Sequence, residues 1–165
     1  MGLEVRGDFG IGVYNSQTIK ELKRMGLISG TASFELKFSQ IRDLSKAIPL
    51  EAIVYGRLPL MITENCIVHN HTGRHSCQEG QTLTDRRGSA SRGEGWGCRN
   101  EILNGKTLFV ADKAADYQKL GLWAVRLMFT TETAEQCVQV LDRYQGKGRY
   151  KPADFTWGLY YRDVE

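Results

Sequence analysis

The four cysteines are the residues whose type and spacing point most directly to chemistry. Two of them, Cys66 and Cys77, lie in the stretch ENCIVHNHTGRHSC, which also contains all three histidines. Successive cysteines are 11, 21 and 39 positions apart, so no pair has the short gap of a zinc knuckle. Three interpretations stay open. They are a zinc site on Cys66, His69, His75 and Cys77, a set of unrelated free thiols, and a cluster held by Cys66, Cys77, Cys98 and Cys137.

Cys137 is the cysteine whose surroundings are most informative. A helix is predicted to begin after Thr133, and on it Cys137 shares one face with Val140, Leu141 and Tyr144. The thiol is therefore expected to point inward from the first turns of the helix, where the helix dipole favours a thiolate or an anionic cluster. A small buried apolar residue is the alternative. The other three cysteines lie in loops rich in glycine and arginine, where packing gives no reason for a thiol, and this favours a cluster.

The histidines give little support to proteolysis. A serine or cysteine protease needs a nucleophile, a base and an orienting group. The only histidines available as bases are His69, His71 and His75, and none lies in a G-x-S-x-G or H-E-x-x-H motif. A cluster would use every cysteine and supply a redox or Lewis-acid centre. These residues favour a cluster enzyme over a peptidase.

The elements that must position these residues follow an α/β pattern. Residues 1–62 alternate strand and helix, which predicts parallel strands joined by crossover helices. Residues 63–111 form a cysteine-rich loop and hairpin region, with a tight hairpin predicted at Asn104-Gly105. The α/β pattern resumes in residues 112–165. The strands are predicted at 11–15, 30–36, 51–62 and 122–130, and the helices at 16–27, 39–48, 114–120 and from 133 onward. Asn15 with Ser16 can cap the first helix, and Thr133 with Gln136 three residues later forms a capping box at the start of the last.

The length of the chain limits the fold. A complete eight-stranded α/β barrel typically needs about 250 residues, and this chain has 165. We therefore expect a single partial domain that supplies half to two-thirds of such a barrel. Active groups in parallel α/β folds collect at the carboxyl ends of the strands. This edge is expected to hold Glu35 and Arg57 as catalytic residues and Asn15 as a substrate contact, with a buried Glu35–Arg57 ion pair as the competing interpretation.

The charge of the chain is modest but unevenly distributed. The formal net charge is +3, and the segment RYQGKGRYK holds four cations and two tyrosines without an acid. This composition suits phosphate contact and base stacking by Arg143, Lys147, Arg149 and Lys151, and a solvated tail is the alternative. The sequence has no apolar run long enough for a membrane span and no signal-peptide pattern, which predicts the reducing cytoplasm.

Several short motifs together resemble one known family. VYNSQT, SFEL, YGRLPLM followed by a cysteine, LTDRRG, the C-x-x-E-x-x-N that begins at Cys98, and TWGLYYR occur in the order found in the collagenase-like peptidases of family U32. The resemblance runs from about Asp8 to Glu165. It departs from the family after the Asp-Arg-x-Gly turn and at Trp157, where the family usually has arginine.

The resemblance implies a fold and a chemistry. The fold would be the carboxyl-terminal half of a TIM-like barrel, with the missing amino-terminal half-barrel as a partner in cis or in trans. Members include oxygen-independent hydroxylases of tRNA, rRNA and ubiquinone precursors, which hold a 4Fe-4S cluster on four cysteines. By resemblance, Cys66, Cys77, Cys98 and Cys137 would be the cluster ligands and RNA the substrate. Prephenate would be the oxygen donor, with Arg57 and Arg126 as candidates to bind it. Peptidase activity on a peptide substrate and a non-catalytic fragment or subunit are the alternatives.

Overall fold

A computed structural model describes residues 2–65, 67–74, 81–84, 90–96 and 99–162. The chain divides into two compact units. Unit 1 comprises Met1–Gly56, Leu108–Pro152 and Thr156–Glu165, and unit 2 comprises Arg57–Thr107 and Ala153–Phe155. Unit 2 covers most of the segment that was predicted as the loop and hairpin region.

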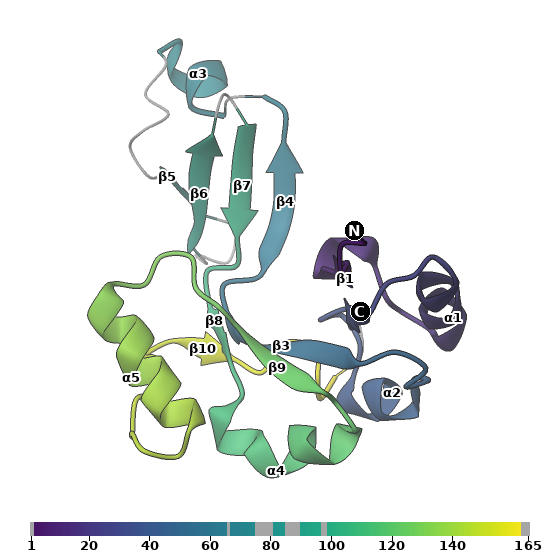
Figure 1. The fold of residues 1–165 in the computed structure, drawn as a ribbon. Helices are drawn as coiled ribbons and strands as arrows, with labels where there is room; N and C mark the ends of the chain where they lie inside the picture. The colour runs from purple at the N-terminus through teal and green to yellow at the C-terminus, as the bar shows by residue number, and fades with distance from the viewer. Residues whose placement is uncertain (1, 66, 75–80, 85–89, 97–98, 163–165) are drawn as a thin grey trace. The chain divides into compact units, whose positions relative to one another are not determined.

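Unit 1 is built on a mostly parallel sheet. Its parallel strands lie side by side in the same order as in the sequence: β1 (Arg6–Gly7), β2 (Ser29–Thr31), β3 (Leu50–Gly56) and β9 (Ala124–Met128). Figure 1 shows β3 and β9 side by side. β8 (Thr107–Phe109) pairs antiparallel with the end of β3, and β10 (Phe155–Thr156) pairs with β8. The mixed α/β class with a mostly parallel sheet is confirmed, and the barrel stays a prediction.

Side chains from the first and last parallel strands meet within unit 1. The Arg6 guanidinium lies 4.8 Å from the ring centroid of Trp123, which directly precedes β9. Arg126 on β9 bonds the carboxylate of Asp8, which directly follows β1. In a flat sheet these strands would be three spacings, or about 14 Å, apart. The parallel sheet is therefore curved.

The helices of unit 1 lie between its strands along the chain. They are α1 (Ser16–Arg24), α2 (Phe38–Asp43), α4 (Ala114–Tyr117) and α5 (Ala134–Tyr144), with 3₁₀ turns at Phe9–Ile11, Ala111–Lys113 and Gln118–Leu120. α1 buries Ile19 and Leu22, and a side chain added at Gly30 of β2 would touch Leu22. α1 therefore packs on the face of the sheet to which position 30 points.

The second and the last predicted helices each differ from the structure in one respect that concerns packing. α2 ends at Asp43 instead of continuing to residue 48, because Leu44 is extended and the Lys46 ammonium bonds the carbonyl oxygens of Ile41 and Leu44 at 2.8 and 2.9 Å. On α5, Val140 is fully buried but Leu141 is 42 % exposed. The prediction that Leu141 faces inward is wrong, because the buried stripe is narrower than the sequence pattern suggested.

The first and third predicted strands are interrupted. Residues 11–15 do not form a continuous strand. β1 lies earlier, and only Val13 bridges Ala32, because Gly12 adopts a left-handed conformation after the first 3₁₀ turn. Residues 51–62 form two strands in different sheets. The break is at Gly56, which has φ +129°, and a Cβ there would lie 2.1 Å from the carbonyl oxygen of Met128.

Unit 2 contains a four-stranded antiparallel sheet (Figure 1). Its strands, in the order β4-β7-β6-β5, are β4 (Pro59–Thr63), β7 (Arg99–Leu103), β6 (Ala90–Trp96) and β5 (Gln81–Thr84), and its helix is α3 (Ile67–Thr72). The predicted Asn104-Gly105 hairpin is wrong, because β7 pairs with β4 and β6 whereas β8 pairs with β3 and β10. Most of the predicted turn LTDRRGS, residues 85–89, lies outside the described residues.

Candidate active site

The carboxyl ends of β1 and β2 place Glu35 beside a tyrosine. Tyr14 follows Val13, and its hydroxyl donates a short hydrogen bond to Oε2 of Glu35. This bond raises the pKa of Tyr14, because the carboxylate stabilises the protonated phenol. The Tyr14 side chain is 47 % exposed. A solvent-accessible pair of a phenol and a carboxylate therefore lies at the predicted edge.

Asn15 lies next to this pair but serves as a helix cap. Its Oδ1 accepts the backbone N–H groups of Gln17 at 3.0 Å and Thr18 at 2.9 Å. The capping function read from the sequence is confirmed. The role of Asn15 in substrate contact stays a prediction, and only its amide nitrogen remains available for it.

A second pair of the same kind lies at the ends of β3 and β9. The hydroxyl of Tyr55 donates to Oε1 of Glu132 at 3.1 Å. The backbone N–H groups of Thr130 and Thr131 donate to Oε2 of Glu132 at 2.8 and 3.0 Å. Glu132 thus has three donors, and the loop after β9 holds its carboxylate in place.

Tyr55 differs from Tyr14 because it is buried, with 1 % exposed. Burial raises the pKa of the Tyr55 phenol, and the negative charge of Glu132 and the neighbouring phenol of Tyr150 raise it further. The phenol therefore stays protonated at neutral pH and remains a donor to Glu132. A carboxylate with a fixed phenolic donor can accept and return a proton.

Sequence reasoning missed Tyr14, Tyr55 and Glu132. A usable signal was present for each, since Tyr14 and Tyr55 lie near the ends of predicted strands and Glu132 directly precedes a predicted helix cap. The pairing itself carries no sequence signal, because Tyr55 and Glu132 are 77 positions apart.

Arg57 binds backbone carbonyl groups within its own unit. It belongs to unit 2, where its Nη1 donates to the carbonyl oxygen of Asn104 at 3.0 Å and to that of Gly105. Glu35 belongs to unit 1 and bonds Tyr14. The alternative of a buried Glu35–Arg57 ion pair stays a prediction, because the two residues lie in different units. The catalytic roles of Glu35 and Arg57 stay predictions.

Arg126 is held between two carboxylates. Its guanidinium bonds Asp8 and Glu51, and Glu51 also accepts the hydroxyl of Thr31 at 2.6 Å. Arg126 pairs with Ile53 in the middle of β3, so its contact with Glu51 points back toward the amino-terminal half of that strand. Its predicted role in binding a substrate carboxylate stays a prediction, and a substrate would have to compete with Asp8 and Glu51.

The basic segment after α5 is partly tied to unit 1. Arg143 and Lys151 lie 2.5 and 3.1 Å from the two carboxylate oxygens of Asp112. These contacts lower the pKa of Asp112, with Lys151 the larger cause. The Lys147 ammonium bonds the side chain of Gln145 at 2.8 Å. Arg149 is exposed, and no hydrogen bond or ion pair of its side chain occurs within the part of the chain that the structure describes.

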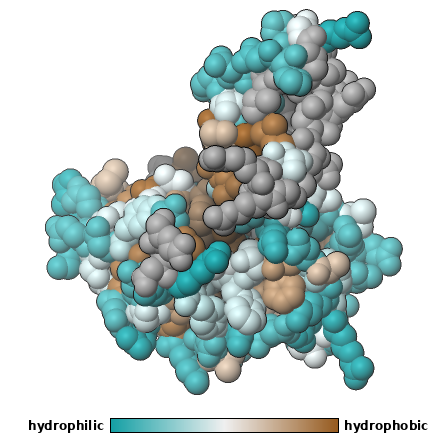
Figure 2. Space-filling view, turned by 180° about the vertical axis from the view of Figure 1, so that it is seen from behind, coloured by the Kyte–Doolittle hydropathy of each residue, from teal (hydrophilic) through white to brown (hydrophobic). Residues whose placement is uncertain are grey.

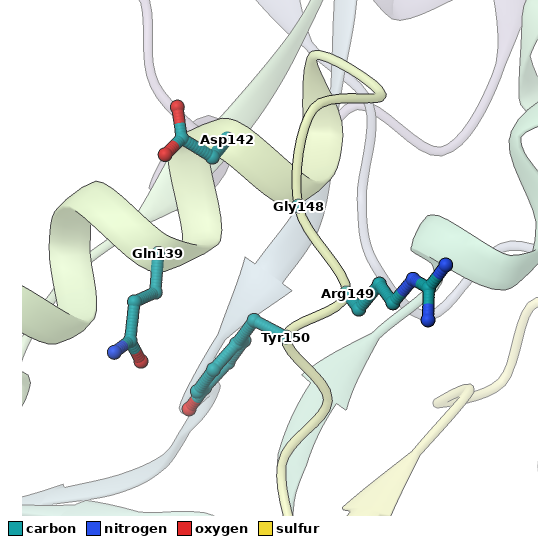
Figure 3. Close-up of a pocket in the computed structure, with 5 residues that line it drawn as sticks. All are labelled: Gln139, Asp142, Gly148, Arg149 and Tyr150. Atoms are coloured by element: carbon teal, nitrogen blue, oxygen red, sulfur yellow. The ribbon is translucent and has the colours of Figure 1, made fainter.

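This segment also forms one wall of a pocket with a volume of about 320 Å³. The pocket is lined by Gln139, Asp142, Gly148, Arg149 and Tyr150. In Figure 3 the side chains of Gln139 and Tyr150 lie toward one another, and the guanidinium of Arg149 extends away from them. The pocket lies between α5 and the segment that leads away from it.

Cys137 is the one cysteine that lies within the described residues. Its thiol is free and half-buried on α5. Cys66, Cys77, Cys98 and His75 lie outside the described residues, whereas His69 and His71 lie on α3. Among the described residues no group of three His, Cys, Asp or Glu side chains is arranged to hold a metal ion. The cluster and the zinc site therefore both stay predictions.

On the face shown in Figure 2, most of the coloured residues are hydrophilic, with hydrophobic patches between them. Of the helices that the structure describes, none is long and apolar enough to cross a membrane.

Comparison with known proteins identifies the family. No curated protein and no solved structure matched the chain. The model of peptidase family U32 matches residues 1–147, which is most of the sequence. This match agrees with the motifs that resemble the family, and the chain therefore belongs to peptidase family U32.

Proposed function

We propose that this chain is an iron–sulfur enzyme of family U32 that hydroxylates a base of tRNA or rRNA without oxygen. Cys66, Cys77, Cys98 and Cys137 would hold a 4Fe-4S cluster, and prephenate would be the oxygen donor. The observation that carries the proposal is the free thiol of Cys137, half-buried on α5, in a chain whose family is shown. A half-buried thiol in the first turns of a helix fits a ligand position.

The cluster would supply redox or Lewis-acid chemistry. The described residues would supply the proton handling and the placement of the substrate. The Tyr55–Glu132 pair supports the first function, because a buried donor and a fixed carboxylate hold a proton at the ends of β3 and β9. The basic segment supports the second function through phosphate contacts.

Peptide hydrolysis is the second candidate function, and the family description favours it. It would need no iron and would use a nucleophile and base that the described residues do not identify. A non-catalytic role, with activity only after an amino-terminal half-barrel is added, also follows from the resemblance. Peptide cleavage by protein free of iron would favour the peptidase function.

The test of the cluster is anaerobic purification of the full chain followed by iron and sulfide analysis. We expect brown protein with about four irons per chain. Cys137→Ser should lose iron as completely as Cys66→Ser, whereas Val138→Ser, an exposed control on the same helix, should keep it. Zinc without iron would overturn the cluster. If Cys137→Ser keeps its iron while Cys66→Ser loses it, Cys137 is not a ligand of the cluster.

Salt dependence tests the RNA part of the proposal. Neutralising Arg143, Lys147, Arg149 and Lys151 together should flatten the dependence of RNA affinity on salt, because fewer counterions are released. Arg143 and Lys151 already neutralise Asp112, so the Lys147 and Arg149 changes should account for most of the effect. An unchanged slope would remove this segment from the RNA-binding surface.

A further inference from the structure

The pocket beside α5 combines an aromatic wall with an amide and a cation, Arg149, that has no partner among the described residues. Its volume of about 320 Å³ lies at the lower end of the range of small-ligand pockets, about 300–1,000 Å³. Tyr150 supplies a phenol ring and Gln139 a side chain with both a donor and an acceptor. This set of groups suits a planar, polar ligand that can stack and form hydrogen bonds at its edge.

The wall of the pocket is firmly placed. The backbone N–H groups of Lys147 and Gly148 donate to the carbonyl oxygen of Asp142 at 2.8 and 3.1 Å. A Cβ at Gly148 would lie 3.2 Å from the Cβ of Asp142, so the segment passes close over α5 at this point. Arg149 and Tyr150 therefore leave α5 from a fixed position.

The directions of the side chains match the shape of a nucleotide. Gln139 and Tyr150 lie toward one another, whereas the Arg149 guanidinium extends to the other side (Figure 3). The base and the phosphate of a nucleotide lie on opposite sides of its ribose. A base between Gln139 and Tyr150 would therefore leave its phosphate on the side of Arg149, a cation without a partner in the described part of the chain.

The pocket is also linked to the candidate active site. Tyr150 lies close enough to Tyr55 to raise the pKa of that phenol, and Tyr55 bonds Glu132. A ligand that packs on Tyr150 would therefore lie beside the Tyr55–Glu132 pair at the ends of β3 and β9.

We propose that this pocket binds one unpaired RNA base, packed on Tyr150 and hydrogen-bonded by Gln139, with Arg149 on the adjoining phosphate. The inference rests on the proposed RNA substrate and names how that substrate is held. Stacking on an aromatic side chain requires a base that is not paired, so the site selects single strands or loops over duplex.

The test uses the full chain and a short single-stranded RNA that carries one 2-aminopurine, a base whose fluorescence falls when it stacks. We expect quenching on binding and weaker binding of the same RNA annealed to its complement. Tyr150→Phe keeps the ring and should bind within about twofold of wild type. Tyr150→Ala should bind about tenfold more weakly. Gln139→Ala should bind about fivefold more weakly, and Gln118→Ala, an exposed glutamine outside the pocket, should be unchanged.

Equal binding of duplex and single strand, no quenching, or unchanged binding by Gln139→Ala would overturn the pocket. If Tyr150→Ala fails to fold, the proposal is judged by the quenching seen with wild type and by the RNA affinity of Gln139→Ala. Iron analysis on the same preparations separates the two proposals. If the protein binds the base but contains no iron, the pocket proposal stands and the cluster enzyme is wrong. If the protein contains iron but Tyr150→Ala binds RNA as wild type does, the cluster stands and the pocket proposal is wrong.

Discussion

Two pairs of the same chemical type lie at the carboxyl ends of the parallel strands but in different environments. Tyr14 and Glu35 are accessible to water, whereas Tyr55 is buried and its partner Glu132 has two further backbone donors. A hydrogen bond contributes more to folding when leaving its partner unsatisfied is costly. The two pairs should therefore differ in their contribution to the free energy of unfolding.

Replacing Tyr55 tests this difference. Tyr55→Phe should lower the free energy of unfolding by about 1–2 kcal/mol, because the Glu132 carboxylate loses a buried donor. Tyr14→Phe is the matched control and should change it by less than about 0.5 kcal/mol, since water replaces the lost donor. Denaturant unfolding measures both. Equal effects of the two variants would contradict the assignment of Tyr55 as the buried partner.

Asp112 predicts a pH dependence of stability. Its folded-state pKa is lowered below the ordinary 3.8 by Lys151 and Arg143. Its contribution is therefore present above about pH 4 and is lost as pH falls through the folded-state pKa. Asp112→Asn should remove this part of the acid-induced loss. Because Asp112 and its two cationic partners are partly exposed, Asp112→Asn should change the free energy of unfolding at pH 7 by no more than about 1 kcal/mol.

Thermal unfolding from pH 7 down to pH 2 measures the Asp112 contribution. The control is Asp154→Asn, since within the described ranges Asp154 forms one ion pair, with the exposed Lys106 at 3.2 Å. The melting temperatures of wild type and Asp154→Asn should fall in parallel below pH 4. The melting temperature of Asp112→Asn should fall less steeply. The same acid slope in Asp112→Asn as in wild type would show that the ion pairs with Arg143 and Lys151 contribute nothing to folding.

At the scale of elements, the end of β3 depends on a glycine. Gly56 has φ +129° and the carbonyl oxygen of Met128 occupies the space that a Cβ would need, at 2.1 Å. This close approach joins β3 to β9 and ends the strand before Arg57. The contact between Gly56 and Met128 thus places Tyr55 next to the loop that carries Glu132.

Gly56→Ala should therefore be strongly destabilising, by more than about 3 kcal/mol, because both the conformation and the contact must change. Gly26→Ala is a useful comparison. Gly26 also has a left-handed conformation, with φ +86°, but has open space around it. Its substitution should lower the free energy of unfolding by only about 1–2 kcal/mol. Chemical denaturation or, for an unstable variant, the yield of folded protein measures the difference. Similar losses for the two variants would show that the β3–β9 contact is not tight.

At the scale of the molecule, the parallel sheet of unit 1 leaves strand edges without partners. In the described residues β9 pairs only with β3 and β1 only with β2. Val125 on β9 is 37 % exposed and Trp123 before it is 56 % exposed. Unpaired edges with apolar side chains favour association. That the chain is part of a larger sheet stays a prediction.

The chain alone should therefore form oligomers or larger species. Sedimentation velocity should show mass above that of a monomer, and Val125→Lys should shift the distribution toward monomer by placing a charge at the edge. Val138→Lys on α5, which is 57 % exposed in wild type, is the control and should leave the distribution unchanged. Addition of an amino-terminal half-barrel should also reduce association. A monodisperse wild-type monomer would contradict the half-barrel interpretation.

The sequence by itself determined those features that depend on residues a few positions apart. The cap of α1 by Asn15 and the reciprocal bonds of Thr133 and Gln136 at the start of α5 were predicted correctly, because a capping side chain bonds backbone groups two or three residues away. The mostly parallel sheet followed from the alternation of short strands and helices. The family followed from motifs that lie in a fixed order.

Tertiary structure decided which segments meet. Asn104-Gly105 forms a turn between two sheets instead of a hairpin, because the neighbouring strands find better partners far away in the sequence. Likewise, the third predicted strand divides at Gly56 because the backbone of Met128 approaches it. Tyr55 and Glu132, and Asp112 with Lys151, are brought together only by strand order and helix packing. Hydrogen bonds and ion pairs between distant residues depend on positions in space, and the local pattern of a sequence does not contain them.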